Sequence, residues 1–410
     1  MILEEAMLDR VSGSAVGEAG ATAAVHTSDV TARSNDGRTG RPRTIRSIDL
    51  FAGAGGLSLA ARQAGIKVVA AVEMHPRACE TYRANLVEDS SGNTVLYEAD
   101  ISTLEPEQLR ATHFSASKPC DIVLGGPPCQ GFSTHRIRSA GVGDPRNELL
   151  LRYFAFVEVL TPKIFLVENV PGILWPRHKE FLDGFYSLGR AAGYHVHPPV
   201  VLDARDYGVP QRRKRVFILG VHNDSNIQIN WPPPPTHADS GSGAESNRLQ
   251  AWLTAESVFS APVGKWDMND VHMNHSDSLV KAFAATPHNG GSRNQSGRTL
   301  PCHSKHDGHW DVYGRIDPTL PGPTMTTACI NPSKGRFVHP TENHGITVRQ
   351  AARFQTFPDD FMFHGGLMST GEQVGNAVPV ALGKALLLSI KRAIIQSRRA
   401  EIAAEECAHS

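Results

Sequence analysis

A cysteine and a glutamate, each following a short and largely apolar stretch, are the residues of this chain best suited to covalent chemistry. The stretch Asp121–Leu124 leads into GGPPCQGFS, so that Cys129 follows a glycine turn and two prolines. The stretch Ile164–Val167 ends in the same way at Glu168. We expect both stretches to be buried strands, because they are short, apolar runs. The carboxyl ends of parallel strands face the crevice where open α/β sheets bind ligands. A thiol there can act as a nucleophile and a carboxyl group as an acid.

Each residue also has a plainer interpretation. Cys129 could be a structural cysteine in a turn, and Glu168 a helix cap or a solvated charge at the end of a strand. The presence of both groups at the ends of successive strands favours a shared functional site.

The motif GGPPCQGFS followed by ENVPG resembles the DNA cytosine-5 methyltransferase family. Further motifs follow in the family's order, from DLFAGAGGLSLA to VGNAVPVALG, so that the resemblance covers about residues 45–390 apart from a variable middle. It implies methyl transfer from S-adenosyl-L-methionine to carbon 5 of a flipped-out cytosine in a specific double-stranded DNA sequence. It also implies a covalent Cys129 adduct at carbon 6, with Glu168 assisting at N3.

A glycine turn near the start of the chain predicts a nucleoside cofactor site. The expected first strand, Thr44–Phe51, runs into FAGAGG and an amphipathic helix that ends near Gly65. Glycines let a ligand approach the backbone, and a helix start offers free N–H groups. Glu73 ends the second strand, Lys67–Glu73, where a carboxylate can accept both ribose hydroxyls. This spacing also suits NAD, but the turn does not match GxGxxG, and the resemblance implies S-adenosyl-L-methionine.

The resemblance adds two distant segments to this cofactor site. Asp100 and Ile101, after an expected strand Thr94–Asp100, would hold the adenine, although Asp100 alone would be interpreted as a helix cap. Asn376 and Val378, before an amphipathic C-terminal helix, would close back on the glycine turn. The predicted cofactor residues are Asp49, Phe51, Gly53, Gly55, Gly56, Leu57, Glu73, Met74, Asp100, Ile101, Pro127, Asn376 and Val378.

The run QRRKR before an expected strand, Val216–Val221, matches the family's Q-x-R-x-R. Alternate residues of an extended segment share a face. The resemblance places Arg215 against the flipped cytosine with Arg213 and Gln211 supporting the catalytic site, whereas a basic surface patch is the plainer alternative. The glycine-containing, basic loop after Cys129 suits closure over DNA. The predicted DNA contacts are Gln130, Ser133, Arg136, Arg138, Gln211 and Arg336.

The alternation of strands and helices predicts a doubly wound, Rossmann-like α/β methyltransferase domain with a smaller, irregular target-recognition domain. The resemblance adds a sheet of seven strands, one of them antiparallel. Further expected elements are helices at Pro76–Leu86, Glu148–Leu160 and His178–Ala192 and a strand at Val196–Leu202. The expected parts are a disordered arm (1–43), a catalytic domain (44–221 and 346–395), a recognition domain (222–345) and a tail (396–410).

Composition limits the class of protein. The 410 residues contain 41 Lys+Arg and 41 Asp+Glu, which argues against wholesale basic character but permits a basic face on a DNA cleft. Six scattered cysteines do not indicate a disulfide framework. There is no apolar run of membrane-spanning length and no signal-peptide pattern, so we expect a cytoplasmic monomer associated with the nucleoid through DNA.

Two further stretches contain notable side chains, one a Cys/His group and the other a glutamine in place of a glutamate. Cys302, His303, His306 and His309 have metal-like spacing, but no second cysteine pair lies nearby, and we expect DNA contacts there and no metal. The segment Thr347–Phe361 resembles the part of the family that organises the recognition domain. Gln350 replaces a glutamate common there, and we expect this to weaken one salt bridge.

Two alternative functions remain open from the sequence. One is a tRNA cytosine-5 methyltransferase of the same fold. The other is a non-catalytic DNA-binding regulator, which should have lost Cys129, Glu168 or the cofactor glycines, and all are present. A separately acting restriction endonuclease is an expected partner of a DNA-modifying enzyme, and the sequence does not reveal the recognised bases.

Overall fold

Strands that are buried on both faces form the centre of the catalytic part. The computed structural model describes residues 43–87, 94–127, 148–241, 248–297 and 311–408, and Thr44–Ser410 is a single compact unit. The strands of the main sheet are β1 (Arg46–Leu50), β2 (Lys67–Glu73), β3 (Val95–Glu98), β4 (Ile122–Gly125), β5 (Ile164–Asn169), β6 (Tyr194–Val196), β7 (Val200–Asp203) and β8 (Lys214–His222). Their order is β3-β2-β1-β4-β5-β8-β6, and β7 also pairs with β8.

The sheet has the predicted parallel core, and β8 is antiparallel to β5. It has eight strands, one more than predicted, because the expected strand Val196–Leu202 is two strands, β6 and β7, that pair with successive parts of β8. The residues between them are His197, Pro198 and Pro199. Proline has no N–H to donate to a ladder, so the pairing is interrupted there.

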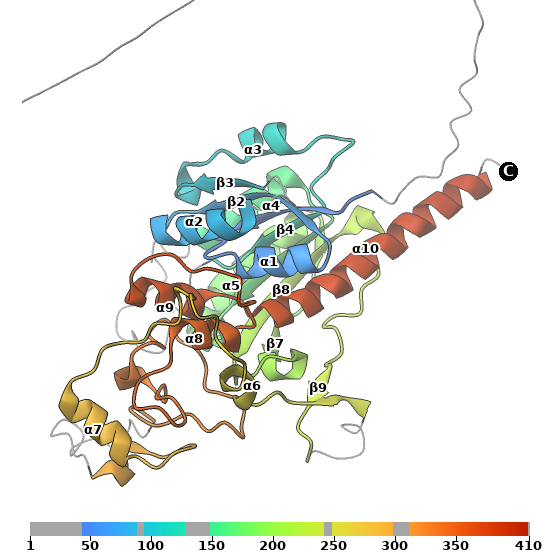
Figure 1. Cartoon of the computed structure of the whole chain (residues 1–410). Helices are drawn as coiled ribbons and strands as arrows, with labels where there is room; N and C mark the ends of the chain where they lie inside the picture. Colours follow the sequence, from blue (N-terminus) through green and yellow to red (C-terminus); the bar gives the residue numbers. More distant parts are fainter. Residues whose placement is uncertain (1–42, 88–93, 128–147, 242–247, 298–310, 409–410) are drawn as a thin grey trace, which may run out of the picture. The chain divides into compact units, whose positions relative to one another are not determined.

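Helices cover both faces of this sheet, as predicted for a doubly wound domain (Figure 1). They are α1 (Gly56–Gln63), α2 (Pro76–Tyr82, continued by a π turn to Val87), α3 (Pro106–His113), α4 (Glu148–Leu160) and α5 (Lys179–Ala191), followed near the C-terminus by α8 (Val348–Phe354), α9 (Leu367–Asn376) and α10 (Val380–Ala408). Alternate strand residues face opposite sides. Leu124 and Leu166 pack on the side of α1 and α10, while Val123 and Phe165 pack on the side of α4 and α5.

The C-terminal helix α10 is 29 residues long and packs against α1 (Figure 1). It continues to Ala408, so the predicted separate tail from residue 396 is wrong. Its far half is anchored, because Arg398 pairs with Asp121 at 2.7 Å and the Ser397 hydroxyl donates to the Ser225 carbonyl. In the described part of the chain no helix, α10 included, combines the length and apolar character needed to span a membrane.

The region 222–345 contains little regular structure where it is described. Its elements are a two-stranded ladder of β9 (His237–Ala238) and β10 (Gln250–Ala251) and the helices α6 (Glu256–Phe259) and α7 (Asp277–Ala285). The fully buried Arg315 donates to the carbonyls of Phe283, Thr286 and His339. One guanidinium therefore joins loops that have few backbone ladders of their own.

Helix α8 connects this region to the catalytic part. Arg349 is fully buried, pairs with Asp267 and donates to the Phe361 carbonyl. Thr347 and Gln350 form a capping box, in which each side chain bonds the other residue's backbone N–H. Glutamine can occupy this position of a capping box as glutamate does, so the cap at the start of α8 accounts for Gln350.

Candidate active site

Glu168 lies at the tip of β5, directly beside the start of the loop that carries Cys129. Strands β4 and β5 are parallel neighbours, with Gly125 opposite Val167. A side-chain carbon at the next glycine, Gly126, would come within 3.3 Å of Glu168 Oε2. The sheet therefore brings this carboxylate to a point three residues before Cys129 in the chain.

The partner of Glu168 is Arg215 of β8. Arg215 Nε lies 2.9 Å from Glu168 Oε1, and the two side chains are only 14% and 11% exposed. Burial raises the pKa of the Glu168 carboxyl above its usual range, while the positive charges of Arg215 and Arg213 act in the opposite direction. Burial therefore favours the protonated form of this carboxyl more than water would.

The predicted partners Arg213 and Gln211 have internal roles. Arg213 is fully buried and donates to the carbonyls of Met325, Gly375 and Ala377. The positive charge of Arg213 lowers the pKa of Glu168, but its N–H groups bond the backbone of two distant segments. Arg213 therefore positions the site and does not face a substrate.

Gln211 is also fully buried. Its amide donates to the Phe354 carbonyl and to Gln355 Oε1, and its oxygen accepts from the Met325 N–H. The structure thus replaces the predicted DNA contact of Gln211 with an internal link between the approach to β8, the region 222–345 and α8.

The glycine turn after β1 has the close approaches that its sequence predicts. Gly53 and Gly55 have positive φ values of 57° and 95°, which L side chains rarely adopt. A side-chain carbon at Gly56 would lie 2.7 Å from the Val378 carbonyl oxygen. The segment of Asn376 and Val378 therefore closes back on the turn, and the Asn376 side chain is exposed beside it.

Glu73, at the tip of β2, is tied to the same turn. Its Oε2 accepts from the Gly53 N–H at 2.8 Å, and its Oε1 accepts from the N–H groups of Met74 and His75. A carboxylate has about four lone-pair positions, and these three N–H groups use three of them, so Oε2 keeps one position for a further bond. The adjacent Met74 side chain is 62% exposed and Phe51, at the turn, is partly exposed, so both remain available to a ligand.

Asp49 does not reach this surface. It is 1% exposed and accepts the Ser58 hydroxyl at 2.5 Å, and the Tyr82 hydroxyl donates to Ser58 in turn. Burial raises the Asp49 pKa to about 7, and the Ser58 bond opposes that rise. Asp49 joins β1 to α1 behind the glycine turn, which is a positioning role and not the predicted cofactor contact. Ser58 and Tyr82 were not predicted, because neither carries a motif by itself.

Two further cofactor predictions need correction. The side chain of Leu57 is 5% exposed and packs towards Gly383 of α10, and that of Ile101 is 3% exposed in the core. In this arrangement the Ile101 side chain cannot cover an adenine ring, and the Leu57 side chain belongs to the core. Asp100 caps the short helix Ile101–Thr103 through the Ser102 N–H, which is the plainer of its two interpretations.

Two other predicted residues are located near the site or in the recognition region. The buried Pro127 accepts from the Asn169 side-chain amide at 3.5 Å, so the residue after Glu168 helps to hold the start of the Cys129 loop. The ENV motif contained this signal, but no role was predicted for Asn169. Arg336 pairs with Asp311 and donates to the carbonyls of Gly290 and Arg315, so most of its guanidinium is used within the recognition region.

Several predictions lie outside the described residues. These are Cys129, the DNA contacts Gln130, Ser133, Arg136 and Arg138, and the group Cys302, His303, His306 and His309. Within the described ranges, no set of three or more His, Cys, Asp or Glu side chains is arranged to hold a metal ion.

Comparison with known proteins gives consistent matches over most of the chain. A family model described as C-5 cytosine-specific DNA methylase matches residues 45–392. The chain is 33% identical over 344 residues to the type II methyltransferase M1.HphI of Haemophilus parahaemolyticus, covering 84% of this chain and 86% of that protein. It is 30% identical to the type II methyltransferase M.AgeI of Thalassovita gelatinovora, over 85% and 100% of the two chains. An E. coli structure described as a prophage-encoded DNA modification methyltransferase has a TM-score of 0.66 at 25% identity, covering 86% of this chain and 99% of its own.

Proposed function

The chain belongs to the C-5 cytosine-specific DNA methylase family, and we propose that it methylates a flipped-out cytosine of double-stranded DNA through a covalent bond to Cys129. It is an enzyme, a DNA (cytosine-5)-methyltransferase. The observation that carries the proposal is the placement of Glu168. This buried carboxyl is held by Arg215 and lies next to Gly126, three residues before Cys129.

The chemistry requires a nucleophile and a proton donor on one base. Carbon 5 of cytosine is a poor nucleophile because the ring is aromatic and electron-poor. The Cys129 thiolate forms a bond to carbon 6, and the proton held by Glu168 is shared with N3, which stabilises the negative charge that develops on the ring. Carbon 5 then accepts the methyl group. Loss of the proton from carbon 5 and departure of the thiolate restore the aromatic ring and free Cys129.

The methyl donor in this proposal is S-adenosyl-L-methionine, which supplies an electrophilic methyl group on a sulfonium centre. The described residues fit such a molecule. The turn at Gly53 has open space where a side chain would stand, and Glu73 keeps one acceptor position, on Oε2, for a ribose hydroxyl. Phe51, Met74, Asp100 and Asn376 would complete the site.

Cytosine must leave the duplex to reach this pocket, because its ring carbons are stacked between neighbouring pairs. The region 222–345 would read the surrounding bases, and the loop after Cys129 would close over the DNA. The named relatives are type II methyltransferases, which supports a modification enzyme that acts beside a separate restriction endonuclease.

The direct test is to replace the nucleophile. Cys129→Ser should abolish methylation and keep cofactor binding, because a hydroxyl is a far weaker nucleophile than a thiolate at neutral pH. Duplexes that contain 5-fluorocytosine should trap a covalent complex with the wild type only, since fluorine cannot leave as a proton does. Cys407→Ser, at an exposed cysteine of α10, is the matched control and should behave as the wild type. Near-normal turnover of Cys129→Ser, or methylation of tRNA in place of duplex DNA, would refute the proposal.

A further inference from the structure

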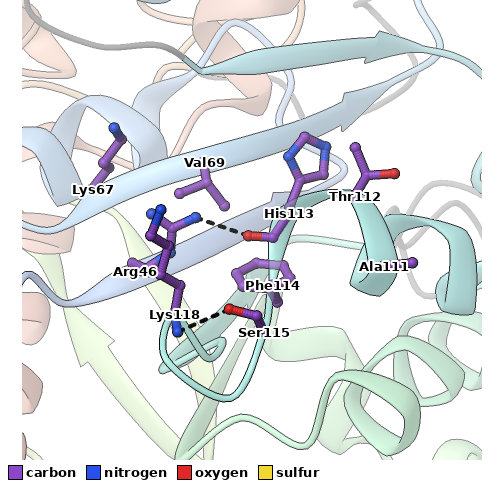
Figure 2. Close-up of a pocket in the computed structure, with 9 residues that line it drawn as sticks. All are labelled: Arg46, Lys67, Val69, Ala111, Thr112, His113, Phe114, Ser115 and Lys118. Atoms are coloured by element: carbon purple, nitrogen blue, oxygen red, sulfur yellow. Dashed lines mark hydrogen bonds between the residues drawn. The ribbon is translucent and has the colours of Figure 1, made fainter. Parts of the chain in front are cut away.

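Figure 2 shows the residues that line a cavity of about 340 Å³. The cavity lies at the edge of the sheet where β1 and β2 begin, opposite the edge that carries the candidate active site. It is lined by the starts of β1 and β2, the last turn of α3 and the turn before β4. Parallel strands place their starts and their ends at opposite edges. The cavity is at the start of β1 and the glycine turn follows its end, so the length of the strand separates them. Strand β1 has five residues, each of which advances roughly 3.3 Å.

The lining has an excess of positive charge. It contains Arg46, Lys67 and Lys118 and no aspartate or glutamate. Within the part of the chain that the structure describes, none of these three side chains forms an ion pair with a carboxylate. The nearby Asp121 accepts the backbone N–H of Arg46, and its other oxygen is bonded by Arg398.

The position of Arg46 is fixed. Its Nη2 donates to the His113 carbonyl at 2.8 Å, as Figure 2 shows, and its guanidinium lies 5.9 Å from the centre of the Phe114 ring. The Nε of the same group is buried and has no hydrogen-bond partner. The His113 carbonyl is at the end of α3, where a free carbonyl would repel an anion, and the bond from Arg46 offsets this charge.

Three cations without carboxylate partners around one cavity repel one another, and an anion bound between them would offset this repulsion. The Ser115 hydroxyl, which also contacts that of Ser117, adds one hydrogen-bonding group, whereas the Thr112 hydroxyl donates to the Gln108 carbonyl. Val69 and Phe114 supply an apolar wall. Lysine and arginine side chains with hydroxyl donors are the groups that recognise phosphate.

We propose that this cavity is a phosphate-binding site, separate from the site of methyl transfer. The phosphate belongs either to the backbone of DNA that extends beyond the target sequence or to a small phosphorylated molecule. Both sources present the same charged group to Arg46, Lys67 and Lys118.

The experiment uses the full chain and the double variant Lys67→Gln/Lys118→Gln. Both lysines are exposed, so the variant should keep the wild-type melting temperature. Lys179→Gln is the control, because it removes the same charge from an exposed lysine that is paired with Asp183 on α5. Calorimetry at one fixed ionic strength should show that inorganic pyrophosphate binds the wild type and the control. The double variant should bind it roughly tenfold or more weakly, since each charged hydrogen bond contributes substantially to affinity.

A short duplex of A·T pairs, which offers no cytosine, identifies the source of the phosphate. If DNA supplies it, the double variant should bind this duplex more weakly, with a salt dependence reduced by about one per lysine removed. If a small molecule supplies it, duplex affinity should stay unchanged while pyrophosphate binding is lost. Absence of pyrophosphate binding to the wild type, or equal binding by the double variant, overturns the proposal.

Discussion

Arg215 and Glu168 meet across two antiparallel strands, with Nε of one 2.9 Å from Oε1 of the other. Arg213, two residues earlier, is instead bonded to three backbone carbonyls. The two arginines therefore stabilise different things. Arg215 tunes a carboxyl at the proposed reaction centre, and Arg213 holds the recognition region and the segment before α10 against the sheet.

Substitution by lysine should separate these two roles. Arg213→Lys leaves buried carbonyls without donors and should lower the free energy of unfolding by about 1–3 kcal/mol. Arg215→Lys keeps a positive charge beside Glu168, so it should change stability less than Arg213→Lys. It should lower kcat by about tenfold or more, because a point charge does not reproduce the guanidinium fork. Denaturant unfolding and single-turnover methylation measure the two effects. The opposite pattern, with kcat lost and stability kept in Arg213→Lys, would return Arg213 to the catalytic group.

The stability of the protein should depend on pH through Asp49. Its folded-state pKa is raised to about 7 from 3.8, so the folded state holds a proton that the unfolded state has released in that range. The contribution of protonated Asp49 to the free energy of unfolding is complete below pH 3.8 and is lost progressively as the pH rises to about 7.

Asp49→Asn should remove this dependence, because asparagine can still accept the Ser58 hydroxyl but cannot ionise. Relative to the variant, the wild type should lose stability between about pH 4 and pH 7 and then stay constant, by about 4 kcal/mol at most. Urea unfolding of both proteins across this range provides the measurement. Parallel stability curves for the two proteins would show that Asp49 is not buried as the structure has it.

Glu73 should contribute to cofactor affinity beyond its bonds to the turn. Glu73→Ala removes the charged acceptor that Oε2 offers to a ribose hydroxyl and should weaken S-adenosyl-L-methionine binding by about 1.5–3 kcal/mol. Glu73→Gln keeps one acceptor for the N–H groups of Gly53 or His75 and serves as the matched comparison. Calorimetry should show that Glu73→Ala binds S-adenosyl-L-methionine more weakly. Its binding to specific DNA should be unchanged, which serves as the control for correct folding. An unchanged affinity in Glu73→Ala would remove Glu73 from the site.

The region 222–345 should determine the methylated sequence, because base readout needs side chains at base edges, and in the proposed mechanism the catalytic part would be committed to one flipped cytosine. Exchange of this segment with that of a relative of different specificity should transfer the target sequence, as measured by methylome sequencing. A second chimera should keep the native residues 321–331, because Met325 bonds both Gln211 and Arg213. An active chimera that still methylates the original sequence would place base readout elsewhere.

The sequence was most informative where function depends on strand tips. Parallel neighbours must bring Glu168 beside the Cys129 loop, and a glycine turn followed by an acidic strand end must bring Glu73 to Gly53. The roles of Gln211 and Arg213 could not be predicted, because their partners lie more than 100 residues away and are mostly backbone atoms that no sequence pattern marks. The interruption of Val196–Leu202 was predictable from its two prolines, and the helical extension to Ala408 from its run of alanine and glutamate.

The packing of α10 against α1 has a consequence for how the molecule is made. Lys391 of α10 donates to the Ala64 carbonyl at the end of α1, across 327 positions of sequence, and the Val378 carbonyl fills the space beside Gly56. During synthesis the first strand, its turn and α1 emerge long before the residues that cover them. The turn can therefore reach its final form only when nearly the whole chain has been translated. A nascent or truncated chain should not retain the cofactor, and a bound cofactor should mark a finished molecule.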